Sequence, residues 1–582
     1  MTHARANAVG GVRGFPHSWE AACWLILVFA AVLRLYHLSL KPLHHDEGVN
    51  AYFLARLFRQ RVYQYDPANY HGPTLYYFAL LISSFIEIFS QPNELTTVAI
   101  RLVPALFGIA TVALLLSLRK QMGDIGVLVA AALVTVSPGA VYFSRDFIHE
   151  SLLVFFTLGV PVAMLRYRDT RKASYLVLAS ASVALMFATK ETATISAIVL
   201  LLALLVAFLC SPGPLVTTIA EIGSKLESSR PRKRGEGLSR AVLVWVLATV
   251  VFVVLYALFY SSFMSDPSGI YHGIETFRYW VRTGSQQHRA PWYTYLRWME
   301  QAELPILALG IVGTVLALWR RRDRFALFTG LWAWGLLAAY SLLPYKTPWL
   351  MLNYIIPMAM VSGYAVQAGW DWVRRLAPDR LAQLMLALMA LTLIASLTQS
   401  ITLNFFRYDD ARLPYVYMQT RREFILMVEE INAITARSGS GRQIAITVTS
   451  RDYWPLPWYL RDYSYVGYPG RVVPLNADII IASETQEREL IPLMADNYRR
   501  VGSYPLRPAV TLVLYARCTI KTDATKRHRG EVRFLDARGR AADDGLSFLN
   551  SRTFFRQFTA AWRKFQDHFR EARRFDEAPE CK

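Results

Sequence analysis

The chain alternates long apolar stretches with short polar and basic segments between residues 21 and 403. Two of the stretches, residues 192–210 and 241–264, contain no Asp, Glu, Lys or Arg. About 20 apolar residues in a helix are enough to cross the ~30 Å hydrocarbon core of a bilayer. The pattern therefore predicts transmembrane helices, and we expect an α-helical polytopic membrane protein.

Basic residues between the apolar stretches predict the orientation of the helices. Clusters of Lys and Arg occur at alternate connections, and such clusters favour the cytoplasmic side. They lie at residues 119–120, 166–172, 225–240, 320–324 and 374–380. With residues 1–20 in the cytoplasm, eleven spans within a transmembrane domain of residues 21–403 satisfy this alternation, and everything after residue 403 lies outside. The spans are predicted at residues 21–40, 101–118, 125–143, 151–165, 175–189, 192–210, 241–260, 304–319, 325–340, 350–369 and 381–403.

The segment between the first two spans needs a separate interpretation. Residues 72–89 are apolar enough to cross, but counting them as a span would invert every later connection. We therefore predict juxtamembrane helices at residues 47–60 and 72–89, inside one outer loop of residues 41–100. The alternative is that residues 72–89 cross the membrane fully and that one later span is wrong.

Beyond residue 403 the pattern changes to short apolar runs that alternate with helical periodicity. Residues 443–448, 478–482 and 510–515 are typical of strands, and residues 421–436 and 486–498 of helices. Alternating strands and helices predict a small extracytoplasmic α/β domain over residues 404–518. Residues 519–582 form a basic tail with an amphipathic helix that lies on lipid or docks on the outer domain.

Composition and charge agree with a membrane protein. The chain is 54% hydrophobic and only 18% charged, whereas about 25% charged residues is usual in soluble domains. The net charge of +20 is explained by basic cytoplasmic loops that meet anionic lipid, and no motif for nucleic-acid binding occurs. The bilayer, and not nucleic acid, is the expected partner.

An acidic pair, Asp46 and Glu47, follows the first predicted span. Partial burial and mutual repulsion are expected to raise the pKa of one of the two carboxyl groups. A carboxylate with a raised pKa suits a general base that takes a proton from a hydroxyl. The alternative is an ordinary solvated acidic loop.

Basic residues on the same predicted side are candidates for binding a phosphate. Arg145 follows a span, Lys190 interrupts an apolar region, and Lys346 lies in a proline-rich connection. A lipid-linked phosphate at the headgroup level would explain cations on the side opposite to the basic clusters. The alternatives are an ion pair of Lys190 with Glu191 and simple snorkelling of Lys346.

Three further residues, Glu150, His71 and His149, are candidates for binding the acceptor or the sugar. The histidines do not have a metal-ligand spacing such as HExxH, so no metal site is predicted, and a divalent metal is left open. The chain also has no GxxxxGK[ST] phosphate loop for a nucleotide. No cofactor is therefore predicted with certainty.

The order of these motifs resembles the GT-C superfamily of the protein O-mannosyltransferase and aminoarabinose-transferase type. Residues 344–349 and 453–459 are similar to a prokaryotic branch described as flippase-activity-associated. The motifs that carry the resemblance are Asp46-Glu47, residues 71–77, residues 101–108, Ser137-Pro138 with Ser144-Arg145, and Thr189-Lys190.

The resemblance implies roles for particular residues. Asp46 occupies the position of the catalytic carboxylate that activates the acceptor, and Glu47 is its supporting neighbour. Glu150 falls at the second acidic position, and Arg145 matches the arginine beside it. Ile148 stands where many relatives have a further Arg, which puts a donor-phosphate contact there in doubt. The Trp-Trp-Asp signature of oligosaccharyltransferases is missing, which disfavours en bloc transfer to Asn.

The predicted function is transfer of a sugar, with inversion, from a polyprenyl-phosphate donor to an acceptor hydroxyl. The reaction is expected on the extracytoplasmic face of the plasma membrane, and a glycan, a lipid or a protein would supply the hydroxyl. The alternative is a lipid-linked sugar flippase, or an accessory protein of one, without transferase activity. A flippase would use the same basic residues but would not need the acidic pair.

Overall fold

The computed structural model describes residues 16–519, except 62, 69–70, 88–94, 211–233, 284–288, 322, 377–378 and 475. The chain forms two compact units, and residues 454–458 belong to the first unit together with everything before Glu423. The amphipathic helix predicted in the tail of residues 519–582 lies outside the described residues.

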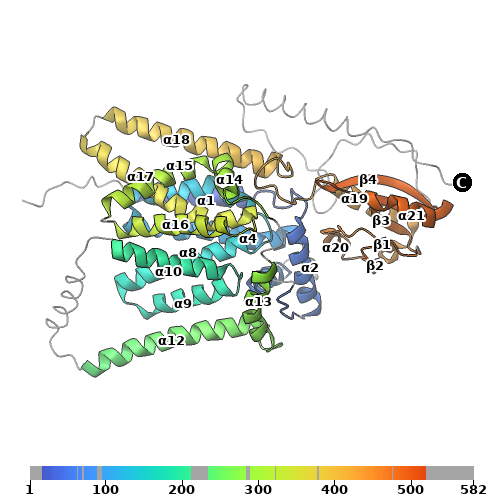
Figure 1. Ribbon diagram of the computed structural model, residues 1–582, viewed down its shortest axis with the longest axis horizontal. Helices are drawn as coiled ribbons and strands as arrows, with labels where there is room; N and C mark the ends of the chain where they lie inside the picture. The colour runs from blue at the N-terminus through green and yellow to red at the C-terminus, as the bar shows by residue number, and fades with distance from the viewer. Residues whose placement is uncertain are drawn as a thin grey trace, which may run out of the picture. The chain divides into compact units, whose positions relative to one another are not determined.

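The first unit is a bundle of helices (Figure 1). Its helices are α1 (Pro16–Leu35), α2 (His45–Gln60), α3 (Thr74–Glu87), α4 (Thr97–Leu116), α5 (Arg119–Met122), α6 (Asp124–Val136), α7 (Pro138–Ser144), α8 (Glu150–Thr170), α9 (Ala173–Phe187), α10 (Ala193–Cys210), α12 (Arg234–Tyr260), α13 (Gly269–Thr283), α14 (Thr294–Ala302), α15 (Leu304–Arg320), α16 (Arg324–Leu342), α17 (Leu352–Leu376) and α18 (Asp379–Ile401).

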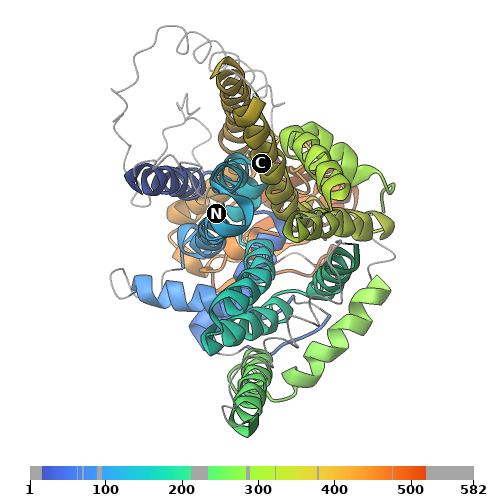
Figure 2. The ribbon, with the colours of Figure 1, turned by 90° about the vertical axis from the view of Figure 1, so that its left-hand side faces the viewer.

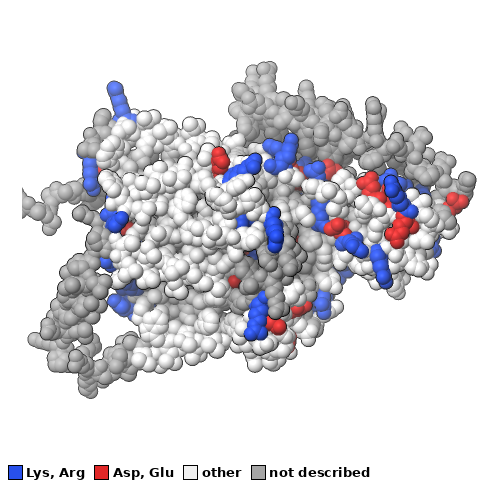
Figure 3. All heavy atoms as spheres, viewed as in Figure 1, with Lys and Arg blue, Asp and Glu red and all other residues white. Residues whose placement is uncertain are grey.

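Eight helices among the described residues are long and apolar enough to cross a membrane, and ten if two bent pairs each count as one span. The bent pairs are α6 with α7 and α14 with α15. The predicted span at residues 175–189 corresponds to α9, which is apolar but has only 15 residues. Figure 3 shows that the visible flank of the bundle is almost free of charged side chains. The prediction of a multi-pass helical membrane protein is confirmed.

The segment that contains α2 and α3 starts and ends at the same end of the bundle. Arg101, near the start of α4, donates hydrogen bonds to the carbonyl oxygens of Leu38 (2.7 Å) and Lys41 (2.9 Å), just after α1. Since the end of α1 and the start of α4 meet, the chain between them makes no net crossing. This geometry agrees with one outer loop and disagrees with a further span at residues 72–89.

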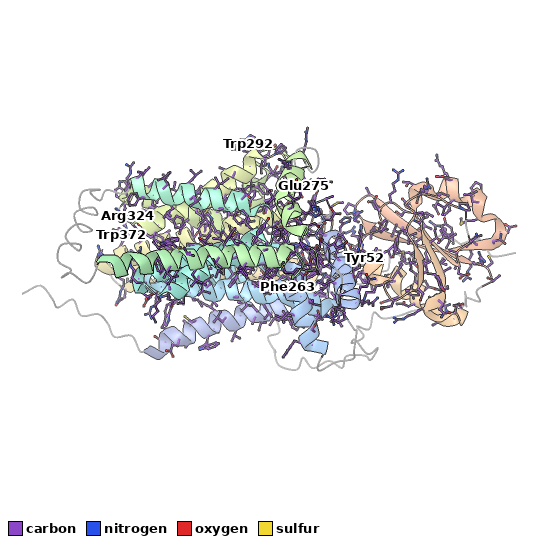
Figure 4. All side chains as sticks on the ribbon, turned by 90° about the horizontal axis from the view of Figure 1, so that it is seen from below. Tyr52, Phe263, Glu275, Trp292, Arg324 and Trp372 are labelled. Atoms are coloured by element: carbon purple, nitrogen blue, oxygen red, sulfur yellow. The ribbon has the colours of Figure 1, made fainter. Side chains whose placement is uncertain are left out.

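Residues from the predicted cytoplasmic clusters gather at the opposite end. Arg166 donates to the carbonyl oxygen of Ser117 (2.6 Å), and Lys120 forms an ion pair with Asp169 (2.7 Å). In Figure 4, Arg324 and Trp372 lie at this end, whereas Phe263 and Tyr52 lie at the other. The bundle therefore has one basic end and one end that carries the candidate catalytic residues.

The centre of the bundle is closely packed and its edge is not. The apolar stretch that contains α17 is 89% buried, whereas those of α12 and α18 are 11% buried. A Cβ atom on Gly363 of α17 would lie 2.2 Å from the carbonyl oxygen of Gly126 on α6, so small residues let these helices approach closely. In Figure 2, α12 (green) lies at the lower edge of the bundle. Helices α12 and α18 therefore present most of their apolar surface outward.

The second unit contains a five-stranded sheet in the order β2-β1-β3-β5-β4. Strand β1 pairs in parallel with β2 and β3, and β5 pairs antiparallel with β3 and β4. Strands β1, β3 and β5 and helices α19 and α21 correspond to predicted elements, whereas β2 and β4 were not predicted. The elements after residue 423 are α19 (Phe424–Ser438), β1 (Ala445–Val448), α20 (Leu456–Tyr459), β2 (Tyr465–Gly467), β3 (Ile479–Ser483), α21 (Glu487–Met494), β4 (Tyr498–Arg507) and β5 (Val510–Arg517). Of these, α20 lies mainly in the first unit.

Candidate active site

The start of helix α2 is fixed by Glu47, which is completely buried. One carboxylate oxygen accepts hydrogen bonds from Arg101 Nε (2.7 Å) and Phe147 N (2.7 Å), and the other from Arg101 Nη2 (2.7 Å) and His44 N (2.8 Å). Burial would raise the pKa of the Glu47 carboxyl, but the guanidinium of Arg101, the ammonium of Lys41 and the N–H of His44 together outweigh burial and lower it. All four bonds go to protein donors, so Glu47 positions its neighbours and does not meet substrate.

A second buried ion pair lies close to the first. Lys41 and Asp146 are each 3% exposed and pair with each other, and the ammonium of Lys41 also lies 3.6 Å from the centre of the Tyr142 ring. Burial lowers the pKa of Lys41 to about 8. Together with Glu47 and Arg101, the pair joins the ends of α1, α4 and α7 by compensated charges. The cluster of these four residues forms a rigid support for the neighbouring residues of the site.

Asp46 is half-buried and lies next to this cluster of paired charges. Its backbone N–H donates to Nδ1 of His44 (3.1 Å), which caps the helix. Its carboxylate makes no hydrogen bond or ion pair with any residue in the described part of the chain. The side chain that the sequence singles out as the catalytic base is therefore available to a ligand.

The expected rise in pKa of one carboxyl group is wrong. Burial would raise the pKa of Asp46, but the positive charges of His44, His45, His71 and Lys190 outweigh burial and lower it. The predicted repulsion is absent because Glu47 turns away into its pair with Arg101. Both carboxyl groups therefore have lowered pKa values.

A network of buried charges faces Asp46 from the connection after α9. Lys190, 5% exposed, forms an ion pair with Glu150, and His71 Nδ1 lies 3.0 Å from Glu191 Oε2. Burial would lower the pKa of Lys190, but the charges of Glu150, Glu191 and Asp46 raise it. Lys190 is thus a permanent cation near Asp46. The alternative predicted from the sequence was an ion pair of Lys190 with Glu191, whereas in the structure Lys190 pairs with Glu150.

His149 lies beneath this network and is 1% exposed. Its Nε2 lies 3.1 Å from the carbonyl oxygen of Gly72, and its ring packs 5.2 Å from that of His71. Burial, reinforced by the charges of His71 and Lys190, lowers the pKa of His149 well below its usual value. His149 is therefore a neutral group that holds His71 in place.

The structure does not bring Arg145 and Lys346 into the same position as Lys190. Arg145 is 2% exposed and donates to the last carbonyl groups of α1 and those just after it, at 2.7 Å from Tyr36 O and 2.9 Å from His37 O. Lys346 is 3% exposed and donates to the carbonyl oxygens of Tyr340, Ser341 and Leu343 at the end of α16. Both cations stabilise helix C-termini, so we leave them out of the site.

Tyr345 and two residues that contact neighbours of Asp46 were not predicted from the sequence. The charge of Asp46 raises the pKa of Tyr345 beyond the effect of burial, which places the phenol close to the carboxylate. The exposed residue Arg289 pairs with Tyr345 through a backbone bridge. Trp454 packs against His45 with ring centres 6.4 Å apart. Arg289 and Trp454 are brought to these positions by contacts across the fold. Spacing along the sequence does not show such contacts, so it could not have identified the two residues.

No group of three or more His, Cys, Asp or Glu side chains in the described part of the chain is arranged to hold a metal ion. The roles considered below use side chains of the chain alone.

Comparison with known proteins identifies the fold. A family model described as dolichyl-phosphate-mannose-protein mannosyltransferase matches residues 71–222. A search of curated proteins finds no match. The structure is similar to the crystal structure of ArnT from Cupriavidus metallidurans bound to undecaprenyl phosphate. The TM-score is 0.56 and the identity 16%, over 86% of this chain and 98% of that chain. The chain has the GT-C fold.

A second solved structure supports the same fold. The oligosaccharyltransferase of Archaeoglobus fulgidus, tethered with an acceptor peptide, is similar with a TM-score of 0.52 and 12% identity, over 86% of this chain and 76% of that chain. The expected GT-C fold is therefore confirmed. The small sheet follows the helical unit in the sequence. The resemblance to the flippase-activity-associated branch stays a prediction.

Proposed function

We propose that the chain is a membrane glycosyltransferase that transfers a sugar from a polyprenyl-phosphate donor to an acceptor hydroxyl. The observation that carries the proposal is the carboxylate of Asp46, which has no hydrogen-bond or ion-pair partner among the described residues and is held beside a buried cation on a GT-C fold. A carboxylate and a cation on the two sides of one bond are what displacement of a phosphate by a hydroxyl requires.

In this mechanism Asp46 acts as the base. The acceptor oxygen attacks the anomeric carbon, the bond from that carbon to the phosphate oxygen breaks, and the phosphate keeps the electron pair. The acceptor proton passes to Asp46. Because the pKa of Asp46 is lowered, the proton moves late, when the forming bond has made the hydroxyl acidic. The single displacement inverts the anomeric centre.

Lys190 stabilises the negative charge that develops on the leaving phosphate. Preorganised charge in a buried site stabilises a developing anion more than exposed charge does. Glu150 and Glu191 hold the ammonium in place, and the incoming phosphate would share it with them. Arg289, which is exposed and joined to Tyr345 by a backbone bridge, is the second cation that we propose for the phosphate.

The orientation in the membrane belongs to the same proposal. The basic end of the bundle fits the cytoplasmic side, because Lys and Arg are retained there. The end with Asp46 and the small domain then lie outside the plasma membrane. A lipid-linked donor is compatible with this placement, because its phosphate lies at the headgroup level and its chain in the bilayer.

The proposal is tested in proteoliposomes that contain a radiolabelled polyprenyl-phosphate sugar and a mixture of glycan, lipid and peptide acceptors. A transferase releases polyprenyl phosphate and labels one acceptor class. A flippase moves the labelled donor between leaflets with its sugar–phosphate bond intact. Transbilayer movement without cleavage, in vesicles where the protein is folded, contradicts the proposal.

A further inference from the structure

A cavity of about 560 Å³ opens between α2, the connection that follows it, and α13. Its volume lies in the range of small-molecule sites, roughly 300–1,000 Å³. None of the residues assigned above to the reaction lines this α2–α13 cavity. Its lining comprises Phe53, Arg56, Tyr63, Gln64, Tyr65, Asp66, Pro67, Asp266, Ser268, His272 and Glu275.

Aromatic side chains give the cavity a firm wall. Tyr63 and Tyr65 are 5% and 2% exposed. The hydroxyl of Tyr65 lies 2.5 Å from the hydroxyl of Thr276 on α13, and its ring packs against Tyr260 with centres 4.9 Å apart. These contacts hold the wall in one position, so a ligand does not have to order it.

The polar lining is mainly acidic. Asp66, Asp266 and Glu275 face a single cation, Arg56. Ser268 donates to one oxygen of Asp266 (2.5 Å), and the carboxylate of Glu275 makes no hydrogen bond or ion pair with the described residues. An excess of carboxylates repels phosphate and sulfate. Carboxylates beside aromatic faces suit the hydroxyl groups and apolar faces of a sugar ring, or an amino sugar.

Packed aromatic rings connect the wall of the cavity to the candidate active site. The ring of Tyr63 packs 5.4 Å from that of Tyr76, which packs 5.7 Å from His149. His149 in turn contacts His71, whose side chain is 42% exposed and faces the Asp46 network. Phe53, which lines the cavity, follows Asp46 by seven residues on α2. This spacing is about 10 Å along a helix, so a chain of a few sugar rings is long enough to extend from the cavity to Asp46.

We propose that the α2–α13 cavity binds sugar rings of the acceptor, so that the acceptor is a neutral or amino-containing glycan. The inference rests on the proposed function, and it narrows the acceptor from three classes to one. The donor phosphate has no place in the cavity, because the carboxylates there would repel it. The phosphate belongs with Lys190, which does not line the cavity.

The test measures sugar binding directly, so that it does not depend on turnover. The full chain with Asp46→Asn, in nanodiscs, is titrated with maltotriose, mannotriose, a glucosamine trimer and a sulfated maltotriose. Binding is followed by saturation-transfer NMR. We expect a neutral or amino trimer to bind and the sulfated trimer not to bind. Glu275→Gln combined with Asp266→Asn should weaken binding about tenfold or more, because hydrogen bonds to charged groups are lost. Glu300→Gln, an exposed acidic residue outside the cavity, is the matched control and should change nothing.

Three results overturn the proposal: preference for the sulfated trimer, equal effects of the cavity variant and the control, or no binding by any neutral or amino trimer. Transfer from the polyprenyl-phosphate donor is measured in parallel with the unaltered chain. Transfer without sugar binding overturns the cavity and leaves the proposed function. Sugar binding that depends on Glu275, without transfer to any acceptor, supports the cavity as a sugar site and overturns the proposed function.

Discussion

The pair of Glu47 and Arg101 offers a sharp prediction about stability. The perturbation is Arg101→Leu, which removes the guanidinium and leaves the completely buried carboxylate of Glu47 without its main partner. Two of the four hydrogen bonds to Glu47 disappear, and the bonds from His44 N and Phe147 N remain. The three bonds from Arg101 to the carbonyl groups of Leu38, Lys41 and Pro42 are also lost.

The expected cost follows from breaking a buried ion pair on one side. Removal of one partner costs about 3–5 kcal/mol, because the other charge stays buried and uncompensated. Replacement of both partners by apolar or neutral groups costs much less than the sum of the single changes. Arg101→Leu with Glu47→Gln should therefore recover about 1–3 kcal/mol relative to additivity.

The assay is thermal unfolding of the full chain in detergent, with the yield of folded protein as a second readout. Arg119→Leu is the matched control, because Arg119 pairs with Asp124 at 2.7 Å where both side chains are about half exposed. Exposed pairs contribute roughly 0–1 kcal/mol. We expect a large fall in melting temperature for Arg101→Leu and little change for Arg119→Leu.

Equal falls in melting temperature for the two single variants would refute the reasoning. The same holds if the double variant is as unstable as the sum of its parts. Either result would mean that the buried pair does not fix the start of α2, and the position of Asp46 would then need another explanation.

Three further predictions concern activity. Protonation of Asp46 should give no acid limb near pH 6 in kcat/KM, because the charges around its carboxylate lower its pKa, and Lys190 should stay charged in the alkaline range, because the neighbouring carboxylates raise its pKa; an acid limb near pH 6 in kcat/KM would contradict this. Lys190→Gln should lower kcat about 100-fold and should also lower the melting temperature, because it leaves the buried carboxylate of Glu150 without its partner. Arg145→Gln should lower the melting temperature but leave kcat of the folded protein nearly unchanged; a fall in kcat for Arg145→Gln and not for Lys190→Gln would show that Arg145 holds the phosphate. Gly48→Ala should lower activity, because its Cβ atom would lie 2.5 Å from Cβ of Pro455 and shift α2; kinetics identical to those of the unaltered chain would show that this contact does not position Asp46.

The helical fold was predictable because the apolar residues of each stretch show by themselves that it lies in lipid. The alternation of basic clusters then decided between a loop and a span at residues 72–89, and the contacts of Arg101 agree with that choice. The strands β2 and β4 were missed for a physical reason. β2 has only three residues with little burial, and β4 contains Pro505 and a bulge, so neither has the period of a buried strand.

The site was predictable only in part, because the type of a residue does not show which acceptors its hydrogen-bond donors contact. Arg145, Lys190 and Lys346 are alike in sequence as isolated cations. In the structure, two of them bind carbonyl groups at helix ends and one faces carboxylates. The predicted rise in the pKa of one carboxyl group of the acidic pair was wrong, since adjacent positions at the start of a helix point in different directions. The ion pair with Arg101 depends on residues 54 positions apart.

The central claim is that Asp46 is the base of a sugar transfer, and single-turnover transfer by Asp46→Asn tests it most directly. The variant keeps the shape of the side chain and leaves the bonds of Glu47 untouched, so its melting temperature should match that of the unaltered chain. With the polyprenyl-phosphate donor saturating, we predict a loss of transfer of at least about 100-fold. Transfer at the normal rate by a stable variant would contradict the account.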